Sequence, residues 1–233
     1  MARHPENRLA RIILTLRRPA LYLGFTLVVI TVAFTTVSPQ VLRELQAHFD
    51  QELAYFTVTD PFLAHVRLSL ALGLLSLAPF CIYWFWRAMA EPFGLSRKVR
   101  LCFVSFCSLL FYSGVAFCFL VTLPLGINFL LGYQSEQLQA VIAVGKFVSF
   151  ITVFVLAFGF IAMLPIFMIF GAKTGLCPRQ TFERKRSYAV LIITIIAALI
   201  TPTPDVVNLS LIAIPIYLLY ESGIIIIKLL KIA

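Results

Sequence analysis

The sequence predicts an all-α polytopic membrane protein with six transmembrane helices and with both chain termini in the cytoplasm. Three observations support this prediction: 61% of the 233 residues are hydrophobic, the apolar residues form six separate runs, and Lys and Arg are unevenly distributed. Only 12% of the residues are charged, about half the usual share in a soluble domain. A fold of this size in water would not hide so much apolar surface, so a lipid bilayer is the expected solvent.

The six apolar runs define the expected spans. A helix needs about 20 apolar residues to cross the hydrocarbon core, and the candidates are residues 21–37, 62–86, 101–123, 147–171, 188–200 and 207–227. The fifth run is short because Pro202 and Pro204 follow it, and proline cannot continue a helix without losing a hydrogen bond. Such a helix requires a locally thinner membrane or shelter behind its neighbours. We therefore expect one integral membrane domain over residues 1–233, in which residues 1–20 form a cytoplasmic segment.

The orientation follows from the positions of Lys and Arg, which are enriched in cytoplasmic loops. Sixteen of the 19 Lys and Arg residues lie before the first run, after the second, between the fourth and fifth, and after the sixth. The intervening loops carry instead most of the acidic residues, among them Glu44, Asp50, Glu52, Asp60, Glu136 and Asp205. Both termini are therefore expected in the cytoplasm. The net charge of +9 is explained by topology, so a nucleic acid is not an expected partner.

The loop over residues 38–61 is expected outside the cell and contains a helical pattern. Its apolar residues recur at helical spacing with polar residues between them, at Val41, Leu42, Leu45 and Phe49. We interpret this pattern as an amphipathic helix at the outer membrane surface. Asp60 and Pro61 then mark the beginning of the second span.

The sequence contains no recognisable set of catalytic residues. It has no Gly-rich phosphate loop and no zinc-protease motif. The five cysteines, Cys81, Cys102, Cys107, Cys118 and Cys177, form no CxxC pair and are interpreted as small buried apolar residues. Neither an enzymatic activity nor a metal or cofactor is expected.

A few polar and proline residues stand out in the apolar runs. Glu221 lies in the sixth run, where a carboxyl group is costly, so it is a candidate for function or for a contact between helices; alternatively it reaches the cytoplasmic interface. Asp205 precedes the same run and is interpreted as its N-cap, a role that leaves a direct part in function open. Pro79, Pro165 and Pro215 are expected to kink their helices. The basic segment 182–188, which includes Arg186, either sets topology or meets anionic lipid headgroups.

Several stretches of the sequence form a recognisable motif pattern. The most specific is Thr-Pro-Thr-Pro-Asp at residues 201–205, followed by Ile-Ala-Ile-Pro-Ile-Tyr at 212–217 and by Tyr220 and Glu221. Weaker similarities lie at residues 108–114 with Phe117 and Pro124, at Ile82, Tyr83 and Trp86, at Phe158, Gly159 and Pro165, and at 184–188. Together these stretches resemble the TatC family, the large subunit of the twin-arginine (Sec-independent) protein translocase, and the resemblance extends over about residues 54–227.

This resemblance implies a cupped bundle with short fifth and sixth helices in the bacterial inner membrane. Members bind twin-arginine signal peptides on the cytoplasmic side and, with single-span TatA- and TatB-type partners, move folded proteins across the membrane at the expense of the proton-motive force. They are not enzymes, need no cofactor and associate with further TatC copies. Carried over to this chain, the signal-peptide contacts are Arg17, Arg97 and Lys98, together with Glu91, which lies near the glutamate of the family's loop motif but out of register with it. The partner or structural contacts are Pro165, Arg186, Asp205, Pro215, Tyr217 and Glu221.

The chain departs from the family pattern where acidic residues are expected. Thr15 stands in place of an acidic residue in the first motif, Ser96 in place of a glutamate before a basic pair, and Met163 in place of Glu or Gln; Ala88 replaces an aromatic residue. Carboxylates are the natural partners of arginine through charge-assisted hydrogen bonds, whereas a basic loop repels arginine.

Three hypotheses follow from these departures. In the first, the chain is a working TatC subunit that binds the signal through Glu91, Glu6 or groups not apparent from the sequence. In the second, it is a divergent paralogue with a structural or assembly role that pairs with a competent copy and does not itself read the signal. The third is an unrelated small-molecule transporter or membrane enzyme. Missing repeat symmetry argues against a transporter, and the missing catalytic set argues against an enzyme.

Overall fold

Long helices run side by side through the computed structural model, which describes residues 5–49, 53–55, 57–132, 142–201 and 206–230. The helices are α1 Pro5–Phe34, α2 Ser38–Phe49, α3 Asp60–Phe93, α4 Arg97–Phe117, a π-helical turn η1 Cys118–Thr122, α5 Leu123–Leu131, α6 Val144–Ala162, α7 Leu164–Lys173, α8 Arg179–Arg184, α9 Arg186–Ile200 and α10 Val206–Leu229. Two short strands, β1 Leu53–Ala54 and β2 Ile142–Ala143, pair in parallel. Pro202, Pro204 and Asp205, with its predicted capping role, lie outside the described residues.

Within the described part of the chain, five helical segments are long and apolar enough to cross a membrane: Thr15–Phe34, Asp60–Phe93, Arg97–Phe129, Val144–Lys173 and Val206–Leu229. The remaining apolar helix, Arg186–Ile200, has 15 residues and is the short fifth segment that the sequence predicts. The prediction of an all-helical, multi-pass membrane protein is therefore confirmed. α3 begins at Asp60 with Pro61 in its first turn, as expected, and ends at Gly94, whose φ of 62° forms a left-handed C-cap.

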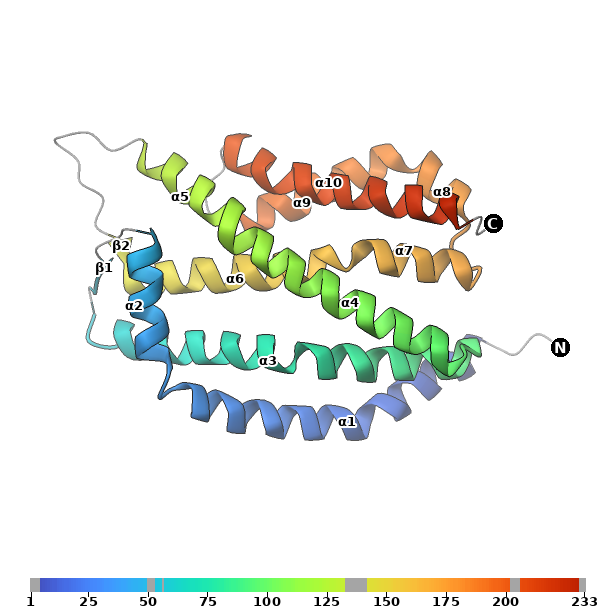
Figure 1. The fold of residues 1–233 in the computed structure, drawn as a ribbon, viewed down its shortest axis with the longest axis horizontal. Helices are drawn as coiled ribbons and strands as arrows, with labels where there is room; N and C mark the ends of the chain where they lie inside the picture. Colours follow the sequence, from blue (N-terminus) through green and yellow to red (C-terminus); the bar gives the residue numbers. More distant parts are fainter. Residues whose placement is uncertain (1–4, 50–52, 56, 133–141, 202–205, 231–233) are drawn as a thin grey trace.

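The helices are arranged in successive layers (Figure 1). α1 packs along α3 at one edge, α6 and α7 follow one another in the middle, and α9 and α10 lie at the other edge. α4 crosses diagonally over the middle of the bundle and contacts both α3 and α6. The first turn of α1 and the last turn of α10 lie at the same end of the bundle, whereas α2 and the strand pair lie at the opposite end. We call these the terminal end and the capped end.

At the capped end, α2 turns its apolar face toward the protein core. Leu45 and Phe49 are buried in the main hydrophobic cluster, and Val41 and Leu42 pack against it. Ser38 fixes the corner between α1 and α2, because its hydroxyl donates to the Thr35 carbonyl at 3.1 Å and lies 3.2 Å from His65 Nδ1 on α3. The amphipathic pattern thus serves packing on the bundle, and the position of this helix at the outer membrane surface stays a prediction.

The fourth predicted span is divided into α6 and α7 at Met163. Pro165 lacks the backbone N–H that would continue the ladder, so the helix is interrupted just before it. Met163 itself is 4% exposed and belongs to the core. Pro79 and Pro215, by contrast, lie inside α3 and α10, which continue through them.

Glycines allow α4 to lie close to α6 where the two helices cross. A Cβ atom at Gly114 would stand 2.7 Å from the Phe158 carbonyl oxygen and would overlap the Ala162 side chain. A Cβ atom at Gly159 would stand 2.7 Å from the Phe111 ring. Close packing through small residues is the usual way in which helices associate in a membrane, where lipid is as apolar as the side chains.

Candidate functional site

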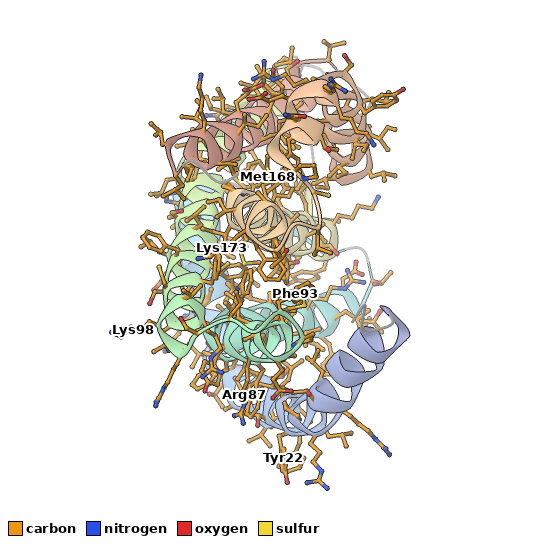
Figure 2. All side chains as sticks on the ribbon, turned by 90° about the vertical axis from the view of Figure 1, so that its right-hand side faces the viewer. Tyr22, Arg87, Phe93, Lys98, Met168 and Lys173 are labelled. Carbon is orange, nitrogen blue, oxygen red and sulfur yellow. The ribbon has the colours of Figure 1, made fainter. Side chains whose placement is uncertain are left out.

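The terminal end of the bundle carries the residues that the sequence singles out for signal binding. Figure 2 looks onto this end, where Arg87, Lys98 and Lys173 come from α3, α4 and α7 respectively. Arg17, Glu91, Arg97 and Lys98 are all exposed, and they come from α1, α3 and α4. The candidate site is therefore a surface built from three helices.

Glu91 is joined to α1 at Thr15, the position where the resemblance to the TatC family implies an acidic residue. The Thr15 hydroxyl donates a hydrogen bond to Glu91 Oε2 at 3.1 Å. Among the described residues, no Lys, Arg or His nitrogen lies within 4.0 Å of this carboxylate. Glu91 thus keeps its second oxygen, Oε1, available to a ligand, beside the helix position that is expected to carry the acid.

The length of α3 places Glu91 beyond the hydrocarbon core. A helix of 34 residues is about 51 Å long, whereas the hydrocarbon core of a bilayer is about 30 Å thick. Glu91 lies two residues before the end of α3 at Phe93. Arg87, one turn earlier, lies over the Trp84 ring at 4.8 Å from its centroid rather than on Glu91.

The other departures from the family pattern have structural roles. Ser96 is the N-cap of α4, and its hydroxyl accepts a hydrogen bond from the Val99 amide at 3.4 Å. Ala88 is 1% exposed and Met163 is 4% exposed, so both face the protein interior. Of the departures, Thr15 and Ser96 alone lie near the surface, and Thr15 contacts a carboxylate.

An aromatic cluster beneath this face holds α3, α4 and α7 together. The Trp86 ring stacks on Phe103 with centroids 4.7 Å apart, and Phe170 meets it edge-on at 5.0 Å. The indole Nε1–H of Trp86 donates to Cys107 Sγ at 3.2 Å, so this buried polar atom is satisfied. The cluster fixes how the helix ends are arranged around the candidate site.

A second polar group joins the beginning of α9 to α10. Arg186 Nη2 donates to Glu221 Oε2 at 3.0 Å, and the Tyr217 hydroxyl donates to Glu221 Oε1 at 2.9 Å. The side chains of Arg186 and Glu221 are 50% and 21% exposed. The hydroxyl of Tyr220, the residue before Glu221, donates to the Phe182 carbonyl at 2.8 Å and attaches α8. The structure therefore brings Glu221, Arg186 and Tyr217 together in a contact between helices.

The two prolines among the predicted contacts lie at different places. Pro165 packs against α10, where a Cβ atom at Gly223 would stand 3.3 Å from its Cα atom. Pro215 lines an apolar groove of about 410 Å³ between α10 and the segment from Phe117 to Leu125. Neither proline contacts Glu91 in any described interaction.

One charged residue was missed by the sequence analysis. Arg67 lies within the predicted second run, residues 62–86, and is the sole charged residue in that run. Its Nη1 donates to the Gly145 carbonyl at 3.4 Å and to Ser149 Oγ at 3.2 Å on α6. A lone charge inside a predicted span was the signal that could have found it.

The capped end also contains a groove of about 340 Å³ beneath α2. Its walls are mostly apolar side chains of α3 and α6, and its polar lining residues are Glu44, His48 and Thr152. The His48 ring stacks on Phe119 with centroids 4.9 Å apart. Among the described residues, no group of three or more His, Cys, Asp or Glu could hold a metal ion.

These helices and their polar contacts define a polytopic helical membrane protein whose exposed charges gather at the helix ends. The chain belongs to the TatC family: the family model "Sec-independent protein translocase protein (TatC)" matches residues 11–215. The TatC protein of Carboxydothermus hydrogenoformans is 31% identical over 183 residues, which cover 77% of this chain and 74% of that protein. The TatC protein of Aquifex aeolicus is 34% identical over 191 residues, covering 79% and 78%. That of Escherichia coli K12 is 30% identical over 168 residues, covering 72% and 65%.

A solved structure supports the same assignment. The crystal structure described as the twin arginine translocase receptor TatC in DDM superimposes with a TM-score of 0.82 and 28% sequence identity. The match covers 92% of this chain and 98% of that chain. The predicted family resemblance is therefore confirmed.

Proposed function

We propose that this chain is the TatC subunit of a twin-arginine translocase in the bacterial inner membrane, with both termini in the cytoplasm. In this role it receives the twin-arginine signal peptide of a folded protein and works with TatA- and TatB-type single-span proteins and with further TatC copies. The family membership and the fold support the role. It is the role of a translocase component rather than of an enzyme.

Within this function, we propose that Glu91 receives an arginine of the signal peptide. The observation that carries this proposal is the 3.1 Å hydrogen bond from Thr15 to Glu91, which holds an exposed carboxylate beside the position where the family has its acid. A guanidinium and a carboxylate form charge-assisted hydrogen bonds that are about twice as strong as neutral ones. Glu91 on α3 would thus supply the carboxylate that the family pattern places at the position of Thr15.

The basic residues of the same surface have complementary roles. Arg17, Arg97 and Lys98 are exposed, and none of them is ion-paired with Glu91 within 4.0 Å. Their donors suit the carbonyl groups of a bound peptide and the phosphates of the inner leaflet. Because these cations repel an arginine pair, Glu91 is the acceptor on which binding should depend most strongly.

Export by this chain alone tests the function. The chain would be expressed in a cell that lacks TatC, and the export of a folded reporter with a twin-arginine signal would be measured. Export supports a working subunit. Stable insertion in the membrane without export and without signal-peptide cross-linking would instead support the alternative, a TatC paralogue with a structural or assembly role.

The contribution of Glu91 is tested by substitution. E91Q removes the charge but keeps the size, and it should weaken signal-peptide binding roughly 10-fold or more, since a hydrogen bond to a charged group is worth about 1.5–3 kcal/mol. T15E in the E91Q background should restore part of the binding, because it returns the acid to the α1 side of the same contact. The control E44Q changes an acidic residue of α2 at the capped end. Equal binding by E91Q and the unchanged chain would rule out this role of Glu91.

The polar group around Glu221 is proposed to support docking of a single-span partner. The Arg186–Glu221 pair fixes the first turn of α9 against α10, so these two helices present one continuous face. E221A should reduce cross-linking to the partner, whereas Y220F at the preceding residue removes a separate hydrogen bond to Phe182 and keeps both side chains of the Arg186–Glu221 pair. Unchanged cross-linking of E221A would refute this role.

A further inference from the structure

We propose that Arg67 and Lys146 form a binding site for the phosphate group of an anionic phospholipid at the capped end of the bundle, on the membrane face opposite to the chain termini. The site lies between the outer ends of α3 and α6. It is separate from the signal-binding surface, and it does not depend on how the translocase function is assigned.

The position of Arg67 along α3 matches the boundary of the hydrocarbon core. Arg67 and Arg87 are separated by 20 residues, which correspond to about 30 Å along a helix. This length equals the thickness of the hydrocarbon core of a typical bilayer. If Arg87 marks the boundary at the terminal end, Arg67 marks it at the capped end. Both guanidinium groups then lie at the depth of lipid phosphates.

The contacts of Arg67 orient its guanidinium group but leave its charge unbalanced. Its two described acceptors, the Gly145 carbonyl at 3.4 Å and Ser149 Oγ at 3.2 Å, are neutral. Both involve Nη1, whereas a guanidinium has five N–H donors in a planar fork. Nε and Nη2 therefore remain for a ligand, and a phosphate matches this fork with two parallel hydrogen bonds.

Lys146 adds a second positive charge in the same turn of α6. It lies between the two residues that Arg67 contacts, and its side chain is exposed. Asp60 is an acidic residue close to this turn of α6, because a Cβ atom at Gly145 would stand 3.8 Å from its carboxylate. That carboxylate accepts a hydrogen bond from the Thr57 amide at 3.3 Å, which attaches it to the first turn of α3. Among the described residues of this turn and its contacts, Arg67, Lys146 and Asp60 together carry a net positive charge.

The surroundings indicate a lipid rather than water. Large apolar side chains are exposed around the site, namely Phe62, Leu63 and Leu70 on α3 and Val153 on α6. An arginine within such a surface extends its charged group to the phosphate level while its aliphatic part stays among acyl chains. An anionic diacyl lipid fits this surface, because its phosphate pairs with the cations and its acyl chains cover the exposed apolar side chains.

Fluorescence quenching in vesicles tests this proposal at the site itself. L70W places a tryptophan one turn below Arg67 on an exposed position. The protein would be reconstituted in vesicles of phosphatidylcholine and phosphatidylglycerol in which one lipid at a time carries brominated acyl chains. The quenching measured for the chain without L70W is subtracted from that of the L70W protein. The difference reports which lipid lies beside the new tryptophan.

The expected result is a preference for phosphatidylglycerol at the L70W position. Each cation near a membrane surface contributes about 1 kcal/mol to the attraction of anionic lipid, or roughly fivefold. R67Q and K146Q should each lower the preference roughly fivefold, and R67K should lower it less because the charge is kept and the fork is lost. The matched control R43Q removes an exposed cation of α2 at the same end and should leave the preference unchanged.

Several outcomes would overturn the proposal. The L70W protein could show no preference, or R67Q, with an unchanged circular dichroism spectrum and elution volume, could keep the full preference. Loss of the preference in the presence of inorganic phosphate would identify a site for free phosphate instead of lipid. If R67Q kept the lipid preference but lost a co-purifying single-span protein, the cation would serve an acidic residue of that partner.

Discussion

Substitution of Gly114 by alanine should destabilise the crossing of α4 and α6. The added Cβ atom would stand 2.7 Å from the Phe158 carbonyl oxygen and would overlap the Ala162 side chain. Backbone atoms contribute to this clash, so it cannot be relieved by a change of rotamer alone. Overpacking of this kind costs about 1–3 kcal/mol, and a glycine-to-alanine change inside a helix returns about 0.5–1 kcal/mol. We therefore expect G114A to lower the free energy of unfolding by about 1–2 kcal/mol.

Two other glycines provide graded controls. Gly24 lies on α1 with no atom within 4 Å of a built Cβ atom, so G24A should be neutral or slightly stabilising. At Gly223 the nearest atom, at 2.8 Å, is Sδ of Met168, whose flexible side chain can move away. The Pro165 backbone at 3.3 Å still limits this adjustment. The expected order of stability is therefore G24A, then G223A, then G114A.

Cysteine labelling offers a direct assay of this order. Cys107 and Cys118 are fully buried and flank Gly114 in the sequence, so a thiol-reactive fluorescent dye reaches them only when the crossing opens. Cys81 and Cys102 are exposed and set the initial signal. Labelling during heating gives midpoints for the three variants, and reversible unfolding in mixed micelles gives free energies. If G114A were as stable as G24A, the close contact between α4 and α6 would not constrain the fold as described.

Four further substitutions test other contacts of the structure. W86F should lower the free energy of unfolding by about 1 kcal/mol, because the stack on Phe103 is kept and the hydrogen bond to Cys107 is lost. W86A should lower it by about 3–5 kcal/mol, and both variants are measured by thermal unfolding. S96A should lower stability by about 1 kcal/mol through loss of the α4 N-cap, and S96D should restore it. E221Q should lower the free energy of unfolding by less than about 1 kcal/mol in the same assay, because Arg186 is half exposed and water screens its charge from that of Glu221. Y220F should increase protease cleavage near α8, which loses its 2.8 Å hydrogen bond at Phe182; unchanged cleavage would show that α8 is held by other contacts.

The helices could be predicted from sequence because the apolar runs are long, but their ends could not. The second run was predicted to end at residue 86, whereas α3 continues to Phe93 through Arg87 and Glu91. Charged residues end an apolar run without ending a helix, since a helix can project beyond the membrane. The division at Met163 was likewise predicted only as a kink, although Pro165 was identified as its cause.

The candidate site was less predictable because it depends on contacts between distant segments. Glu91 was identified from sequence as an acid out of register, 76 residues from Thr15. Its position beside Thr15 results from the packing of α1 along α3, which no local pattern encodes. Ser96 was noted only as a missing glutamate, although its capping role could have been derived from the serine that precedes the α4 sequence. Arg67 was visible in the sequence and was overlooked among the loop charges.

The π-helical turn η1 changes which side of a single long helix meets the rest of the protein. In a regular helix that crosses a bundle diagonally, the face that contacts the bundle gradually turns away from it. One extra residue in a turn rotates all the following residues by about 100° about the helix axis. Before η1, α4 directs Phe111 and Gly114 to the interior, and after it Leu123 and Ile127 are buried. Removal of one residue between Cys118 and Thr122 would turn the buried side of α5 outward while leaving that of α4 in place. The length of η1 therefore determines how far α5 is rotated about the helix axis relative to α4.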